Sequence, residues 1–162
     1  MMEGTQSGYT GENRRAGTQD LSRQLTDERD HMLVAFCRLA GVEPFDDPDN
    51  FEQWRDRLDE FCQILVDYLA IGHFGLYQRI VNGEERRDNV RELARKLYPD
   101  IANTTETALD FNDKYETATL QPASADFSQD LSSLGEILAT RIELEDDLLG
   151  ALNGSTTPTS TQ

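Results

Sequence analysis

Residues 61–82 read FCQILVDYLAIGHFGLYQRIVN, a nearly all-apolar segment in a strongly acidic chain. On a helix, one line of this segment has the i, i+3, i+4, i+7 spacing of a core-facing stripe, and it comprises Phe61, Leu65, Tyr68, Gly72, Leu76 and Ile80, preceded by Trp54 and Leu58. The opposite side of a surface helix should be polar. Here it has a single charged group among Gln63, Asp67, Ala70, Phe74 and Val81. This helix therefore needs to be covered on two sides.

Two kinds of cover are possible for the second side. Other helices or loops of the same chain can pack on it, or another protein can, since exposed apolar patches with polar rims mark interaction sites. A membrane does not fit, because a spanning helix needs about 20 predominantly apolar residues and this run contains Asp67, His73, Gln78 and Arg79. We expect no membrane partner.

The length and net charge of the chain limit the number of domains and the kinds of partner that it can have. A chain of 162 residues is long enough for one domain with a substantial core. Its formal charge of −16, from 31 acidic and 15 basic residues, argues against direct binding to nucleic acid and favours a basic protein partner. Alternatively, the acidity is a solvation device, such as adaptation to a salty cytosol, and the two explanations can coexist.

The termini and the cysteines indicate a cytoplasmic protein. The first 19 residues have no apolar core of a secretory signal, and we expect residues 1–19 to form a disordered lead. Cys37 and Cys62 are too few for a disulfide framework and are expected to be buried, reduced thiols. A Ser/Thr-rich tail, residues 154–162, is expected to be disordered, which leaves residues 20–153 for the folded domain.

Four long helices are predicted between these ends. Asp20 or Ser22 can cap the first helix, which ends at Gly41, and Asp49 or Asn50 can cap the second, which continues to about Asn82. The first helix should bury a stripe widened by Leu33, Cys37 and Ala40. The third helix carries a stripe from Val90 to Ala118, and the fourth carries Phe127, Leu131, Leu134, Leu138, Ile142, Leu149 and Leu152. The predicted fold is all-α, an antiparallel up-and-down four-helix bundle. We expect a kink or short break in the third helix near Tyr98, because Pro99 removes a backbone hydrogen bond there.

Motifs for catalysis or cofactor binding are missing from the sequence. It has no phosphate-binding glycine loop, CxxC pair, HExxH or GxSxG, and we expect no enzyme activity, cofactor or metal. His73 is expected to be a core or edge histidine. The acidic group Glu143, Glu145, Asp146 and Asp147 is expected to be a solvated helix end, with Arg141 pairing to Glu145 at i, i+4. An alternative function is a ligand or metal sensor, with His73, Tyr77 and Cys62 lining a pocket.

Several short motifs resemble one protein family. Leu65-Val66-Asp67-Tyr68-Leu69, then Gly72-His73-Phe74, Tyr77 and Arg79-Ile80 resemble the signature of the Rsd/AlgQ family, bacterial regulators of the primary sigma factor. The resemblance extends from residue 22 to about residue 152 and includes the segments 31–35, 61–63 and 144–146. The sequence departs from it at Ala70, where a serine is expected, and in the divergent connection before Phe51.

The resemblance implies an anti-sigma protein that binds the C-terminal helix-turn-helix domain of the primary sigma factor and blocks its use by RNA polymerase. That domain has a basic face, which suits an acidic partner. The residues expected to bind it are Asp67, Ala70 and Phe74, rimmed by Gln63, Tyr77 and Gln78. The protein is expected to be a monomer or weak homodimer. An adaptor for another cytosolic regulatory enzyme, using the same surface, is a further alternative.

Overall fold

The fold is built from helices throughout the part of the chain that the structure describes. The computed structural model describes residues 3–81, 85–116 and 125–154. Its elements are α1 (Glu3–Ala40), α2 (Phe51–Ala70), the π-helix η1 (Ile71–Tyr77), α3 (Gln78–Val81), α4 (Asp88–Glu116) and α5 (Ala125–Leu152). The all-α prediction is confirmed. The predicted end of the second helix near Asn82 and the predicted end of the third stripe at Ala118 lie outside the described residues.

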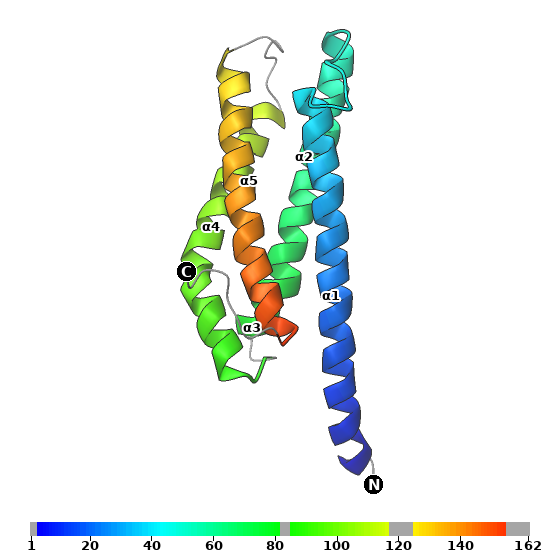
Figure 1. Ribbon diagram of the computed structural model, residues 1–162, viewed down its shortest axis with the longest axis vertical. Coiled ribbons are helices and arrows are strands. Elements are labelled where there is room, and N and C mark those ends of the chain that lie inside the picture. Colours follow the sequence, from blue (N-terminus) through cyan, green and yellow to red (C-terminus); the bar gives the residue numbers. More distant parts are fainter. Residues whose placement is uncertain (1–2, 82–84, 117–124, 155–162) are drawn as a thin grey trace.

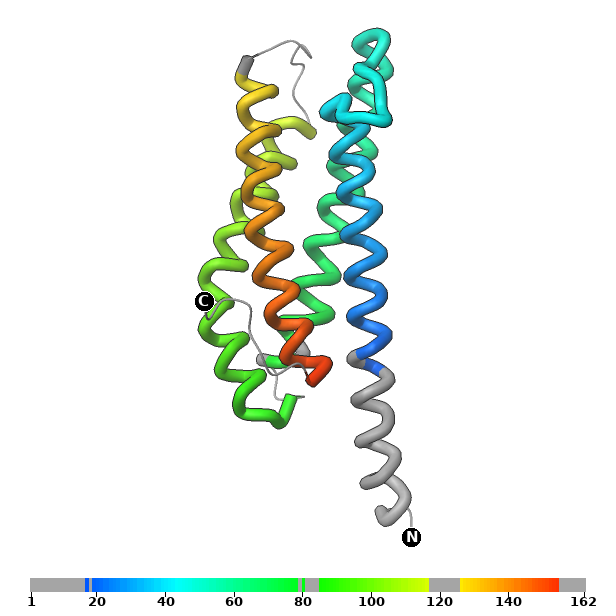
Figure 2. The backbone as a smooth tube through the Cα atoms, in the orientation of Figure 1, coloured from blue at the N-terminus to red at the C-terminus, as the bar shows by residue number. Residues whose placement is uncertain are grey.

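The four long helices pack in two pairs, as Figure 1 shows. α1 lies along α2, and α4 lies along α5, while contacts between α2 and α4 join the pairs. The colour gradient along the backbone in Figure 2 shows that successive long helices run in alternating directions. These alternating directions are the ones expected of the predicted antiparallel up-and-down bundle.

The ends of α1 and α2 have the predicted capping residues. Gly41 has φ of +69°, and the N–H groups of Gly41 and Val42 donate to the carbonyls of Arg38 (3.3 Å) and Cys37 (3.0 Å), a Schellman motif that satisfies the last carbonyls of α1. Asn50 Oδ1 accepts from the backbone N–H of Gln53 at 2.8 Å. Both local predictions are confirmed.

The first long helix begins earlier than predicted. α1 starts at Glu3, so Asp20 and Ser22 lie inside it, and the helix start predicted at one of these two residues is wrong. The division of the chain into a lead at residues 1–19, a domain at residues 20–153 and a tail at residues 154–162 stays a prediction.

α4 is a single helix from Asp88 to Glu116 with Pro99 in its interior. The short break that we considered near Tyr98 is therefore wrong. The alternative, a kink at the same place, stays a prediction.

The core follows the predicted stripes with a few corrections. An aromatic cluster joins α2 to α4 and α5: the ring centroids of Trp54 and Phe127 lie 5.1 Å apart, and those of Phe61 and Phe111 lie 6.1 Å apart. Leu33, expected in the core, is 38% exposed, because the buried line of α1 runs through Met32, Ala35 and Leu39 instead. Cys62 is buried and Cys37 is half-buried. Burial raises the pKa of the Cys62 thiol to about 11, which keeps it protonated.

Candidate functional site

The second side of the continuous helical run α2–η1–α3 is open to solvent at the predicted positions that the structure describes. Phe74 is 62% exposed, the largest fraction among the exposed large hydrophobic side chains whose burial the structure describes. Gln63, Asp67 and Gln78 are also exposed, and Ala70 is half-buried. We call the surface formed by Gln63, Asp67, Ala70, Phe74 and Gln78 the Phe74 face. It is held together in part by a hydrogen bond from Gln63 Nε2 to Asp67 Oδ1 at 3.3 Å.

Tyr77 does not belong to the Phe74 face. It was expected on the rim, but it is only 4% exposed, and its ring packs against that of Tyr98 on α4, with centroids 5.6 Å apart. The reason is that the helix turns Tyr77 toward α4, where it lines a groove with His73 and residues of α4. Cys62 is not part of that lining, so the three residues of the sensor alternative do not meet there.

Phe74 lies within a π-helical segment. This segment was not predicted from the sequence, because the regular turn of an α-helix, 100° per residue, was assumed throughout. The backbone N–H of Gln78 donates to the carbonyl of His73, five residues earlier, the bond that defines a π-helix. Two glycines allow neighbouring helices to come close to it. A Cβ on Gly72 would lie 2.7 Å from Arg141 Nη2 of α5, and a Cβ on Gly75 would lie 2.6 Å from Leu21 Cδ1 of α1. The segment that carries Phe74 is thus wedged between two helices.

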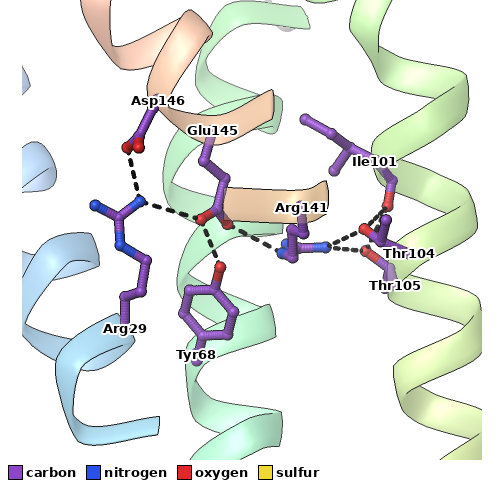
Figure 3. Close-up of polar contacts among 8 residues, drawn as sticks. All are labelled: Arg29, Tyr68, Ile101, Thr104, Thr105, Arg141, Glu145 and Asp146. Atoms are coloured by element: carbon purple, nitrogen blue, oxygen red, sulfur yellow. Dashed lines mark hydrogen bonds and ion pairs between the residues drawn. The ribbon is translucent and has the colours of Figure 1, made fainter. Parts of the chain in front are cut away.

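Arg141, which approaches Gly72 of this segment, belongs to a buried polar network that Figure 3 shows. Arg141 Nε donates to Glu145 Oε2 at 3.0 Å, and Arg141 Nη1 donates to Thr104 Oγ1 at 3.2 Å and to Thr105 Oγ1 at 2.6 Å. The Tyr68 hydroxyl donates to Glu145 Oε1 at 2.5 Å. Arg141 and Glu145 are each 1% exposed. The network joins α2, α4 and α5 through charge-assisted hydrogen bonds, which are stronger than neutral ones.

Arg29 of α1 extends the network, so that it reaches all four long helices. Arg29 Nη1 lies 2.8 Å from Asp146 Oδ1 and 3.8 Å from Glu145 Oε1. Burial raises the pKa of the Glu145 carboxyl, while Arg141, the Tyr68 hydroxyl and Arg29 oppose that rise. Burial beside Glu145 also raises the pKa of the Tyr68 hydroxyl, so Tyr68 stays a hydrogen-bond donor.

The expectation for this acidic helix end was only half right. The Arg141–Glu145 pair is confirmed, but Glu145 is buried, not solvated. The signal that could have found it is spacing. One line of buried residues on α5, which leaves out only the buried Leu149 beside it, alternates steps of four and three through both charged residues: Phe127, Leu131, Leu134, Leu138, Arg141, Glu145, Leu148 and Leu152. Ile142, expected in that stripe, is half-buried.

Replacing Gly72 with alanine should lower the free energy of unfolding by about 1–3 kcal/mol, the usual cost of overpacking. The new methyl group would meet Arg141 Nη2, which cannot move without breaking buried hydrogen bonds. Chemical denaturation measures the loss. In an Arg141→Met background, where the guanidinium is gone, the same substitution should cost less; equal costs in both backgrounds would show that this contact is unimportant.

The described part of the chain has no cluster of metal ligands and no helix that could span a membrane. No group of three or more His, Cys, Asp or Glu side chains within it could hold a metal ion. None of its helices is long and apolar enough to span a membrane. His73 is half-buried at the edge of the bundle, with its ring centroid 4.9 Å from that of Phe74.

Comparisons with known proteins agree on one family. The family model described as "Regulator of RNA polymerase sigma(70) subunit, Rsd/AlgQ" matches residues 5–153. Proteins called "Regulator of sigma D" from Salmonella newport (strain SL254) and Salmonella heidelberg (strain SL476) are each 36% identical over 135 residues, which cover 82% of this chain and 82% of each relative. Members of this family are regulators and not enzymes. The chain belongs to the Rsd/AlgQ family of regulators of the sigma(70) subunit of RNA polymerase.

Proposed function

We propose that this protein is an anti-sigma regulator that binds the C-terminal helix-turn-helix domain of the primary sigma factor in the cytoplasm. Binding would cover the surface by which that domain contacts RNA polymerase and promoter DNA, so the mechanism is occlusion. Family membership supports a sigma(70) regulator, and the net charge of −16 suits a partner whose usual ligand is DNA. The protein itself would contact no nucleic acid and need no cofactor.

The observation that carries this proposal is the exposure of Phe74. A phenylalanine that is 62% exposed on a π-helix wedged between two other helices is costly to leave in water and is held rigidly, and aromatic anchors of this kind often dominate the energy of an interface. Phe74 would be the anchor, Asp67 the ionic contact, and Ala70 the flat surface between them. Gln63 and Gln78 would form the polar rim.

Mixing the full chain with the primary sigma factor, and separately with its C-terminal domain, tests the proposal. We expect a stoichiometric complex with both partners by size-exclusion chromatography with light scattering, and a monomer or weak homodimer for the chain alone. A complex with the sigma factor but not with the isolated domain would contradict the choice of domain. No complex with either partner would contradict the anti-sigma function.

The Asp67→Ala variant should bind the sigma domain severalfold more weakly at low salt and with a shallower dependence on ionic strength. Asp67 is exposed on the Phe74 face, where a carboxylate mainly steers a cationic partner. Titration calorimetry at several salt concentrations measures both quantities. Glu136→Ala, which removes the same charge from an exposed position on α5, is the control. Equal effects of the two variants would mean that only net charge matters.

A further inference from the structure

A groove runs beside the Phe74 face, between η1 and α4. It has a volume of about 380 Å³, with His73 and Tyr77 on the η1 side and residues of α4 on the other. Tyr77 and Ile101 are both buried and form its floor. Tyr98 and Leu109, at 41% and 38% exposure, contribute apolar surface to the α4 side. A polar side chain entering this groove would therefore rest its carbon atoms against aromatic and aliphatic surface.

Three carboxylates line the same groove. Glu106, Asp110 and Asp113 stand at i, i+4 and i+7 on α4 and are exposed. Within the described residues, none of the three forms an ion pair, whereas elsewhere on α4 Arg91 pairs with Asp88 and Arg95 pairs with Glu92. Like charges at i, i+4 on a helix repel each other. A cation placed among them would relieve this repulsion, so the groove is suited to a positive group.

The groove and the Phe74 face are continuous. His73 lines the groove, and its ring stands edge-on to that of Phe74, with the centroids 4.9 Å apart and the ring planes at 83°. A protein that covers Phe74 would therefore also reach the adjoining groove. The Phe74 face supplies the apolar contact, and the groove supplies the negative charge that this face, with Asp67 as its one acid, largely lacks.

We propose that the groove receives a basic side chain of the protein that covers Phe74. Arginine fits it best, since a guanidinium can stack on the half-exposed ring of Tyr98 while donating hydrogen bonds to a carboxylate of α4. This inference rests on the proposed function, because the occupant is a side chain of the sigma domain. It assigns the larger part of the electrostatic attraction to the three carboxylates of α4, and the smaller part to Asp67 on the Phe74 face.

The test is binding of the sigma domain to the full-length triple variant Glu106→Gln, Asp110→Asn, Asp113→Asn. We expect affinity to fall about tenfold or more at low salt, and the slope of affinity against salt concentration to become shallower, because several attractive charges are lost. Fluorescence anisotropy with a labelled sigma domain measures both quantities. Thermal melting confirms that the variant is folded, which the exposure of all three side chains leads us to expect.

A matched variant separates the groove from net charge. Asp27→Asn, Glu136→Gln and Glu143→Gln remove three carboxylates from exposed positions on α1 and α5 and change the charge equally. This control should bind nearly as well as the unmodified chain. Equal losses in both triple variants would overturn the inference, since general attraction would then suffice.

The substitution Tyr98→Leu probes the stacking contact alone. It keeps apolar surface but removes the aromatic face, so it should weaken binding severalfold at any salt concentration. Unchanged affinity in both the groove triple variant and Tyr98→Leu, together with a clear loss in Phe74→Ala, would overturn the groove assignment while leaving the anti-sigma function intact. Failure of the unmodified chain to bind at all would instead overturn the function on which the inference rests.

Discussion

The Arg141→Met variant should lose about 3–5 kcal/mol of unfolding free energy, the usual cost of removing one partner from a buried ion pair. Arg141 is the centre of the buried network, and it bonds to Glu145, Thr104 and Thr105. Without it, Glu145 would be a buried carboxylate supported only by the Tyr68 hydroxyl at 2.5 Å and by Arg29 at 3.8 Å. Denaturant titration followed by circular dichroism measures the loss.

Two further variants test whether the loss in Arg141→Met comes from the unpaired charge of Glu145. Arg95→Met removes an arginine that is 76% exposed and pairs with Glu92 on the surface of α4, so its effect should be far smaller. Arg141→Met combined with Glu145→Gln should recover much of the loss, because no charge is then left unpaired and the amide oxygen can still accept from Tyr68. Equal stability of Arg141→Met and Arg95→Met would show that the network contributes little.

The loss in Arg141→Met should also depend on pH. Burial already raises the pKa of the Glu145 carboxyl, and removal of Arg141 should raise this pKa further. In the folded variant the carboxyl therefore stays protonated at pH values above 4.5, which is its pKa in the unfolded chain. A group whose pKa is higher in the folded state stabilises the fold below its unfolded pKa, and the contribution is lost as pH rises through its folded pKa. The deficit relative to the unmodified chain should thus be smallest near pH 4.5 and grow toward neutral pH. A deficit that is constant over this range would contradict a role for Glu145 ionisation.

The end of α1 and the start of α2 could be predicted because their signals are local. Gly41 and Asn50 satisfy backbone groups within their own turns, and the stripes of α2 and α4 depend only on the spacing of apolar residues. The exposed position of Phe74 was also within reach, since it lies opposite the line from Phe61 to Leu76. These features need no knowledge of how one helix meets another.

The remaining features depend on contacts between helices. The π-helix could not be predicted on the assumption of a regular α-helix, with a rotation of 100° per residue. The π-helix lies where Gly72 and Gly75 leave room for side chains of α5 and α1. The same assumption put Tyr77 on the rim of the Phe74 face, although it is turned toward Tyr98. Glu145 was assigned to solvent because charged residues are rarely buried. Its ion pair with Arg141 is tolerable in the core because residues distant in sequence support it, namely Arg29, Tyr68, Thr104 and Thr105.

Phe74→Ala should weaken binding to the sigma domain by about 2 kcal/mol or more, roughly a thirtyfold rise in Kd. The side chain is 62% exposed in the free chain, so its burial in the complex is gained on binding. For the same reason, its removal should leave the melting temperature nearly unchanged. Titration calorimetry and thermal melting on the same samples separate the two effects.

Phe51→Ala is the matched control, because Phe51 is another exposed phenylalanine, at 44%, and lies at the start of α2, whereas Phe74 lies beyond the end of α2 on η1. It should bind the sigma domain as the unmodified chain does. Full affinity in Phe74→Ala would remove the Phe74 face as the binding site even if a complex forms. A loss shared by Phe51→Ala would point to a footprint along the whole of α2, in which no single aromatic anchor dominates. A loss confined to Phe74→Ala would locate the anchor on the π-helix, where Gly72 and the buried network hold it in place.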